Sequence, residues 1–313
     1  MPHFACLVGG KAAKRSRFGS IWKSHQMGTK LSAKACQKAH LRFHVLDSEW
    51  IWHYLSPEEA KDLVTNFPSL TMVLSFASRH NGALKILRKT LETGIADKLA
   101  LDLVVGNNAY LTRNEAKRAP GRSLVEAVKF ARRHFQGPVF VGTEGMWTTS
   151  AELAAEYDLI PFFLLDRNME ENLGQIRDSM GKGSVAIYVP FIISENYPRL
   201  LDDVLQRLSG YIFRRKWVQK GLRDLGVNPS QPQIRAITQD KQKMTPEFLK
   251  SELGDFLRSA ASTLSLFGTP ETVTERIREL HKVGFDVIVG YPIKENEEQA
   301  LAFGDCIRKV SET

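Results

Sequence analysis

Short apolar runs, rich in β-branched and aromatic residues, alternate along this chain with longer stretches of helical periodicity. Such alternation is typical of βα units that surround a parallel sheet. The runs number eight and span residues 3–9, 41–47, 71–77, 100–106, 138–142, 160–165, 184–191 and 285–290. Eight strands with intervening helices fit a closed barrel better than an open doubly wound sheet. We therefore predict a single α/β domain, a (β/α)8 TIM barrel over residues 1–313.

The clearest helices combine apolar periodicity with capping residues. Ser123 precedes apolar residues at helical spacing and is expected to cap one helix, and Thr149 or Ser150 is expected to cap the next. Thr269 is followed by a proline and a glutamate, the pattern of an N-cap, a first helical position and an acidic first turn. We therefore predict a helix that starts directly after Thr269.

A long segment, residues 194–266, separates the seventh and eighth predicted strands. It holds a helical pattern over residues 199–225 and a polar stretch over 228–245. This length exceeds that of a plain crossover, so we predict a helical insertion that covers one end of the barrel or forms a subunit contact. We accordingly expect a homo-oligomer.

Composition points to a soluble cytoplasmic protein without membrane association. The chain has no apolar stretch that approaches the roughly 18 residues of a spanning helix, and its N-terminus lacks the apolar run of a secretory signal. Its three cysteines, Cys6, Cys36 and Cys306, are widely spaced and form no Cys-x-x-Cys pair. Neither a disulfide framework nor a zinc ribbon is indicated.

The net charge of +8 is concentrated in the region of residues 1–46. Nine lysines and arginines precede the first acidic residue, Asp47, and the rest of the chain is close to neutral. This basic N-terminal region fits an electropositive patch for a phosphorylated or polyanionic ligand, a nucleic-acid-binding arm, an organellar transit peptide, or a solvated face without a ligand.

Two groups of residues have spacings that suggest ligand binding. Residues 142–145 follow the fifth predicted strand and precede a helix, so the backbone N–H groups of Gly142, Thr143 and Gly145 are candidates to hold a phosphate; a plain strand-to-helix turn is the alternative. Cys36, His40 and His44 recur every four residues, which would align three zinc ligands on one helix. Because residues 41–46 instead form a predicted strand, which scatters the three side chains, we expect no metal site.

The C-terminal residues carry the most specific motif. Residues 266–280 and 283–293 contain Gly-Thr-Pro-Glu, an amphipathic helical pattern, a glycine and the eighth predicted strand. This order resembles the end of the luciferase-like flavin and deazaflavin oxidoreductases. The closing Gly-Tyr-Pro-Ile of residues 290–293 is similar to the F420-dependent methylenetetrahydromethanopterin reductases within that superfamily.

Three upstream blocks follow the order of the same family. Residues 78–81 read Ser-Arg-His-Asn after the third strand, residues 101–106 form a glycine-ended fourth strand followed by Asn107, and residues 139–145 are similar to the family's phosphate loop after the fifth strand. The resemblance therefore spans roughly residues 70–313. It implies a TIM barrel that transfers hydride with coenzyme F420 or, alternatively, FMN bound at its mouth.

The resemblance also implies site residues. It places a bulge with a non-proline cis peptide bond at the end of the third strand, against the cofactor ring. The implied cofactor contacts are Ser75, Phe76, Ala77, Ser78, Asn107, Asn108, Gly142, Thr143, Glu144 and Gly145. Asp47, Trp50 and Tyr291 follow strands at the mouth and are candidates for a pocket that binds a small-molecule substrate, with surface or packing roles as the alternative. The phosphate and oligoglutamyl tail of F420 would engage the basic N-terminal region.

Two departures from the family pattern leave two hypotheses about function open. Residues 106–109 read Gly-Asn-Asn-Ala where the reductases have Gly-Pro-Gly-Asp, and residues 6–8 read Cys-Leu-Val where their first strand carries a glutamate. One hypothesis is an F420- or flavin-dependent oxidoreductase that acts on a methylenetetrahydromethanopterin-like carrier of archaeal-type one-carbon metabolism or on another small substrate. The other is a non-catalytic barrel without cofactor that binds a polyanionic ligand or partner.

Overall fold

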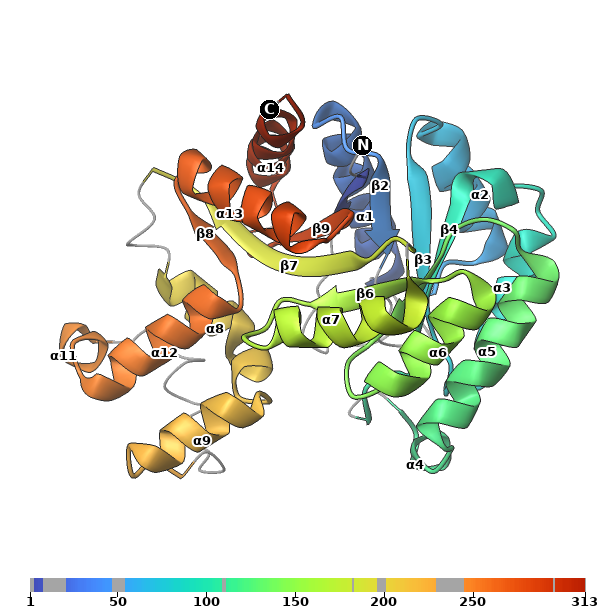
Figure 1. Ribbon diagram of the computed structural model, residues 1–313. Coiled ribbons are helices and arrows are strands. Elements are labelled where there is room, and N and C mark those ends of the chain that lie inside the picture. The colour runs from blue at the N-terminus through green and yellow to red at the C-terminus, as the bar shows by residue number, and fades with distance from the viewer. Residues whose placement is uncertain are drawn as a thin grey trace.

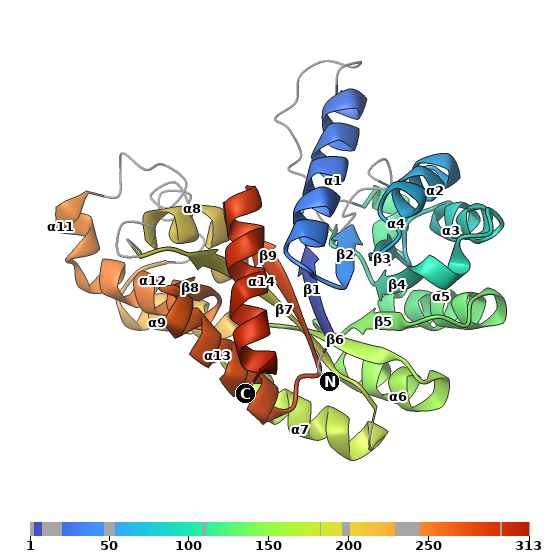
Figure 2. The same cartoon turned by 90° about the horizontal axis from the view of Figure 1, so that it is seen from above.

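The protein is described here from a computed structural model. The structure describes residues 3–7, 21–46, 54–108, 111–181, 183–195, 201–228, 245–294 and 296–312. Helices surround a strongly curved sheet, and a separate group of helices stands beside the barrel (Figure 1). Seen from above, the helices α1 to α7 and α14 lie around the outside of the strands (Figure 2).

Within the described ranges, nine parallel strands form one sheet. They are β1 (His3–Leu7), β2 (Phe43–Leu46), β3 (Thr71–Ala77), β4 (Leu99–Val104), β5 (Val139–Gly142), β6 (Ile160–Leu164), β7 (Ala186–Ile193), β8 (Leu266–Gly268) and β9 (Val287–Pro292). Their order is β6-β5-β4-β3-β2-β1-β9-β7-β8, and an additional β6–β7 pairing closes the ring. The eight predicted runs correspond to the eight strands of this ring, so the predicted TIM barrel is confirmed. The short strand β8, which was not predicted, pairs with the last residues of β7.

The outer layer of the barrel consists of helices that pack on the outward side chains of the strands. They are α1 (Ile21–Lys38), α2 (Pro57–Asn66), α3 (Ala83–Leu91), α5 (Pro120–His134), α6 (Trp147–Tyr157), α7 (Met169–Met180), α13 (Pro270–Val283) and α14 (Glu297–Ser311). The short helix α4 (Arg113–Ala116) lies in the connection between β4 and α5. Side chains such as Leu101 and Leu103 join this helix–sheet core, whereas Ala100 on the same strand joins the cluster inside the barrel. No helix of the described ranges is both long enough and apolar enough to cross a membrane.

The predicted insertion is helical and has an apolar core of its own. It contains α8 (Leu201–Ile212), α9 (Lys216–Asp224), α11 (Pro246–Leu249) and α12 (Glu252–Thr263). Val204, Leu208, Val218 and Leu257 pack together in this core. The helical pattern predicted over residues 199–225 is two helices, because the chain turns at residues 213–215.

Two predicted helix starts are wrong by a few residues. Helix α5 begins at Pro120, so Ser123 is buried within its first turns. Proline fixes the backbone angle φ that a first helical residue needs, and it therefore starts the helix earlier than the serine. Helix α6 begins at Trp147, which places Thr149 and Ser150 inside the helix. The Ser150 hydroxyl donates instead to the carbonyl of residue 142, at 2.8 Å.

The predicted start of α13 is confirmed. Thr269 is the N-cap, and its side chain accepts a hydrogen bond from the backbone N–H of Thr272. The following proline occupies the first helical position. The prediction holds because the N-cap residue, the proline and the acidic first turn all favour a helix that starts directly after Thr269.

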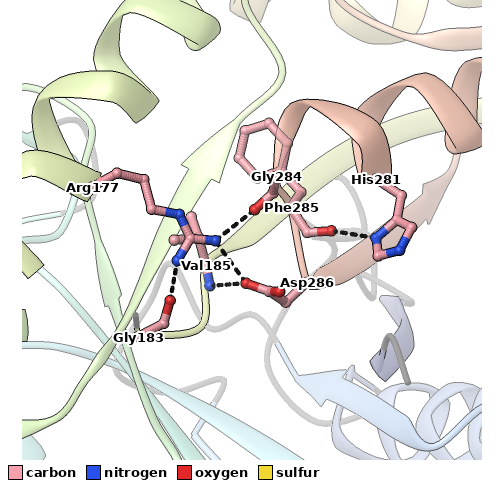
Figure 3. A network of polar contacts seen from close by, with 7 residues as sticks. All are labelled: Arg177, Gly183, Val185, His281, Gly284, Phe285 and Asp286. Carbon is pink, nitrogen blue, oxygen red and sulfur yellow. Dashed lines mark hydrogen bonds and ion pairs between the residues drawn. The ribbon is translucent and has the colours of Figure 1, made fainter. Parts of the chain in front are cut away.

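A network of polar contacts joins two loops at the amino ends of the strands (Figure 3). Arg177 of α7 donates to the carbonyl of Gly284 at 2.7 Å, to Asp286 Oδ2 at 2.9 Å and to the carbonyl of Gly183. Asp286 Oδ2 also accepts the backbone N–H of Val185 at 2.9 Å. This network fastens the entry to β7 to the entry to β9, at the end of the barrel opposite the predicted site.

Candidate functional site

Aromatic side chains fill the middle of the barrel lumen. Ring centroids lie 6.3 Å apart for Phe43 and Phe140, 5.6 Å for Phe140 and Phe162, and 6.3 Å for Phe162 and Tyr188. Tyr291, a predicted substrate contact, stacks on Tyr188 with centroids 5.8 Å apart. The lumen is therefore a packed core, as in other TIM barrels, and a ligand is expected at the carboxyl ends of the strands rather than inside the ring.

The end of β3 contributes both side chains and backbone to the mouth. Ser75 lies in the lumen, whereas the Phe76 ring points outward and packs against Tyr54 with centroids 5.0 Å apart. The Tyr54 hydroxyl accepts the backbone N–H of Ala77 at 2.7 Å, which holds the strand end from outside. Ser78 is buried, and its hydroxyl has no hydrogen-bond partner among the described residues. The described backbone contains no cis peptide bond, so the one implied by the resemblance is absent here.

The turn after β4 presses against the end of β3. Buried Arg79 donates to the carbonyls of residues 105 and 106, at 3.1 and 2.5 Å. Gly106 has a φ of +88°, and a Cβ atom built on it would lie 2.9 Å from the Cβ of Ala77. Only glycine fits this close approach. The turn presents Asn107, which is partly buried, and Asn108, which is exposed.

The turn after β5 has the geometry expected of an anion-binding loop. Thr143 is buried, and its N–H and hydroxyl both donate to the carbonyl of residue 162, so the prediction that its N–H binds a phosphate is wrong. Glu144 and Gly145 are exposed; Gly145 has a φ of +69°, and a Cβ atom placed on it would meet no other atom within 4 Å. Helix α6 starts two residues later, and the first N–H groups of a helix have no partner within it. Backbone donors and the positive end of the helix dipole therefore meet at this turn.

Arg215 at the start of α9 fastens the insertion to the mouth. Its Nη1 lies 3.1 Å from Glu144 Oε1 and 3.1 Å from Asp166 Oδ2, which follow β5 and β6. The guanidinium stacks on the Tyr211 ring at 4.0 Å, and Trp217 Nε1 donates to Asp166 Oδ1 at 2.8 Å. The Arg215 side chain is 10% exposed, and within the described chain its Nε and Nη2 have no hydrogen-bond partner. Burial raises the pKa of Tyr211.

A buried carboxyl group lies two residues before the carboxyl end of β4. Asp102 of β4 accepts a hydrogen bond from the Ser75 hydroxyl at 2.7 Å, and the two residues are direct register partners. Burial raises the pKa of Asp102 to about 6, although the Ser75 hydrogen bond acts in the opposite direction. Its Oδ1 atom is buried without a hydrogen-bond partner in the described ranges. Sequence reasoning missed this residue, whose signal is a lone acid in an otherwise apolar strand.

Several predicted residues lie elsewhere. Asp47 and Trp50 lie outside the described residues, as does the basic stretch 8–20. His44 lies on the outward face of β2, where its Nε2 is 2.8 Å from the Ser32 hydroxyl, and burial lowers its pKa to about 4. The structure therefore separates His44 from the mouth, and the described side chains include no cluster of three metal ligands.

One known protein family matches most of the chain. The model of a family described as "Family of unknown function (DUF7388)" matches residues 29–299. The chain belongs to this family. A curated relative of this DUF7388 member, "Uncharacterized protein MJ1239" of Methanocaldococcus jannaschii, is 26% identical over 206 residues. That alignment covers 66% of this chain and 64% of the relative, so the chain spans less than two thirds of the relative's length.

Solved structures share the fold of this DUF7388 member. An F420-dependent secondary alcohol dehydrogenase in complex with an F420–acetone adduct matches with a TM-score of 0.64, 11% identity and 99% coverage of both chains. EDTA monooxygenase from Chelativorans sp. BNC1 matches with 0.61, 12% identity and coverage of 98% and 94%. The oxygenating constituent of 3,6-diketocamphane monooxygenase of Pseudomonas putida, in complex with FMN, matches with 0.61, 12% identity and coverage of 99% and 98%. These likenesses show the barrel fold, and the resemblance to luciferase-like oxidoreductases and, among them, to methylenetetrahydromethanopterin reductases stays a prediction.

The DUF7388 barrel thus brings most of the predicted cofactor residues to one sector of its rim. Strands β3, β4 and β5 are consecutive neighbours in the sheet, and the predicted residues follow their carboxyl ends. Tyr291 lies near the carboxyl end of β9, the strand opposite β4 in the ring, and its side chain stacks on Tyr188 in the lumen. Phe76 is separated from this sector because its side chain faces the helix layer. A planar ligand at the sector would meet polar groups from two turns and a helix N-terminus from the third.

Proposed function

We propose that this protein is an oxidoreductase that binds coenzyme F420, or alternatively FMN, at the mouth of the barrel and transfers hydride to or from a small substrate. One observation carries the proposal: three consecutive strand ends place a buried serine, an asparagine turn and a glycine turn side by side. Structures that share this fold include an F420-dependent dehydrogenase and a monooxygenase in complex with FMN.

The described residues fit such a cofactor in two respects. The buried Ser78 hydroxyl, which lacks a partner in the described ranges, can donate to or accept from the polar edge of a flat ring. The glycine turn before α6 offers backbone N–H groups to a phosphate. Glu144 adds a negative charge to that turn, and its ion pair with Arg215 offsets this charge. These features support binding of an anionic, ring-bearing cofactor.

The cofactor, when bound, supplies the hydride chemistry. The chain's own residues bind and orient it. The turn at Gly145 and the first N–H groups of α6 hold the phosphate, Ser78 and Asn107 contact the ring, and Arg79 fixes the turn that carries Asn107. Arg215 keeps the insertion against the rim, which helps to exclude water from the mouth. Asp47, Trp50 and Tyr291 are our candidates for contacts to the substrate.

We further propose a one-carbon-bearing pterin of the methylenetetrahydromethanopterin type as the substrate class. The Gly-Tyr-Pro-Ile sequence at residues 290–293 supports it, because Tyr291 lies at the mouth on the side opposite β4. The absence of the reductases' carboxylates from residues 106–109 argues for testing other acceptors as well. Oxidation of reduced F420 by a panel of pterin and non-pterin acceptors tests this step, and no turnover with any acceptor would favour a non-catalytic binding protein.

Cofactor binding is tested by calorimetric titration with F420 and with FMN. We expect Gly145→Ala to weaken binding at least tenfold, because the methyl group disfavours the φ of +69° that the turn requires. Gly94→Ala is the matched control: Gly94 has a φ of +79°, has equally open surroundings, and lies in the loop before β4 at the other end of the barrel. Equal affinity in both variants would remove the turn from the site, and no binding of either cofactor by the wild type would refute the proposal.

A further inference from the structure

The Asp102–Ser75 pair lies inside the barrel, directly beneath the proposed cofactor site. Asp102 alternates along β4 with Ala100, which belongs to the lumen cluster, so its side chain also points into the lumen. It is 4% exposed. One oxygen accepts from Ser75 at 2.7 Å, and the other has no hydrogen-bond partner among the residues described. Burial of a carboxyl oxygen without a hydrogen-bond partner costs free energy, so its presence here points to a role other than packing.

The layer that separates this pair from the mouth is thin. On β3 and β4 the next inward residues are the register partners Ala77 and Val104. On β5 it is Gly142, whose position for a Cβ atom lies 3.1 Å from Val104 Cγ1. Two of these three residues therefore have a methyl group or no side chain. A ligand at the mouth lies a single residue layer above Asp102.

No charged group among the described residues opposes or balances Asp102. Its direct neighbours in register are Ser75 on β3 and Phe140 on β5. Among the inward residues whose side chains the structure describes, the others that can titrate are Tyr188 on β7 and Tyr291 on β9, both phenols that are neutral near pH 7. On β1, His3 takes an inward register position opposite Val287, at the first residue of that strand. Burial and the Ser75 hydrogen bond are the causes that act on the pKa of Asp102. The carboxyl group is therefore sensitive to any further change in solvation or charge above it.

We propose that Asp102, held by Ser75, is the proton-binding carboxyl group of this site and takes up a proton when an anionic ligand covers the mouth. The inference rests on the proposed function for the identity of that ligand. A bound ligand excludes water and adds negative charge, and both effects favour the neutral carboxylic acid. Asp102 thereby provides, from within the lumen, a carboxyl group that the turn after β4 lacks.

Proton uptake on binding is measured by calorimetric titration with F420, and with FMN, at pH 6.5 in buffers of different ionisation enthalpy. With a pKa of about 6 in the unliganded protein, we expect uptake of up to about three quarters of a proton. Asp102→Asn keeps the shape of the side chain and removes the proton site. Because the ligand phosphate also exchanges protons, the quantity that decides is the difference between the wild type and Asp102→Asn.

Ser75→Ala provides a second, independent variant. Loss of the hydroxyl donor removes a group that stabilises the carboxylate, so the pKa of Asp102 rises and maximal uptake moves to higher pH. A purely structural role of the pair would not move this profile. Cofactor binding with no proton uptake, or with uptake that persists in Asp102→Asn, overturns the inference and leaves the proposed function standing.

Failure to bind either cofactor refutes the proposed function, and infrared titration of the unliganded protein then decides the inference. We expect a protonated-carboxyl band that disappears between about pH 5 and 7 in the wild type and is missing from Asp102→Asn. The absence of this band from the wild type overturns the inference.

Discussion

Replacement of Asp102 by asparagine is expected to change how the stability of the protein depends on pH. In the folded protein Asp102 has a pKa of about 6, against 3.8 for an ordinary aspartate. Between about pH 4 and 6 the unfolded chain has lost this proton while the folded protein still holds it. The wild type is therefore destabilised progressively across this window, whereas the variant is not.

The size of the effect follows from the shift. One pKa unit corresponds to about 1.4 kcal/mol, so a shift of about two units corresponds to about 3 kcal/mol of unfolding free energy. His44 acts in the opposite direction, because its pKa is lowered to about 4 by burial and its contribution to stability grows as pH rises from about 4 to 6.5. The wild-type profile alone therefore hides the contribution of Asp102, and the comparison must be made between two proteins that share His44.

The assay is urea unfolding, followed by circular dichroism, of the wild type and Asp102→Asn at half-unit steps from pH 4 to 7.5 and constant ionic strength. We expect the stability of the variant relative to the wild type to rise by about 3 kcal/mol between pH 4 and 6.5 and then to level off. Any fixed effect of the new amide shifts all points equally. A difference that stays constant over this range would show that the pKa of Asp102 is not raised and would refute the reasoning.

Three further substitutions test other parts of the structure. Arg215→Met leaves Asp166 and Glu144 without their shared ion-pair partner, so we expect a loss of about 2 kcal/mol in urea unfolding and earlier proteolytic cleavage within residues 194–266. Unchanged cleavage would contradict this role. Arg177→Met removes the contacts at the amino ends of β7 and β9, and we expect a similar loss of stability with unchanged F420 affinity. Gly106→Ala places a methyl group at a φ of +88° and against the side chain of Ala77. We therefore expect the free energy of unfolding to fall by about 1 to 3 kcal/mol and cofactor binding to weaken. An unaltered melting temperature would argue against the tight turn.

The barrel strands were predictable because strands buried on both faces read as short apolar runs between helical patterns. Strand β8 escaped this reasoning because it has three residues, too few for any run to stand out. The helix starts at Pro120 and Trp147 were misplaced because nearby serines and threonines have equal capping chemistry in a sequence. Tertiary packing decides which of these residues lies at the helix end.

The placement of the candidate site residues was predictable only where it follows from position along a strand. The glycine turn of residues 142–145 follows a strand and precedes a helix, which is readable from the sequence. Arg215 was missed because its partner Glu144 lies 71 residues away and no local pattern links them. Asp102 was missed because its neighbours on β4 are apolar, although its alternation with Ala100 and its register with Ser75 become evident once β3 and β4 are paired.

The closure of the ring between β1 and β9 has a consequence for the protein's biosynthesis. Strand β1 pairs on one side with β2, but its other side waits for β9, where His3 pairs with Val287. At about 5 to 20 residues per second, a ribosome needs on the order of 15 to 60 s to make the chain between these two strands. Throughout that time β1 has no partner on the side that β9 occupies in the folded protein, and an unpaired strand edge of this kind can pair with other chains.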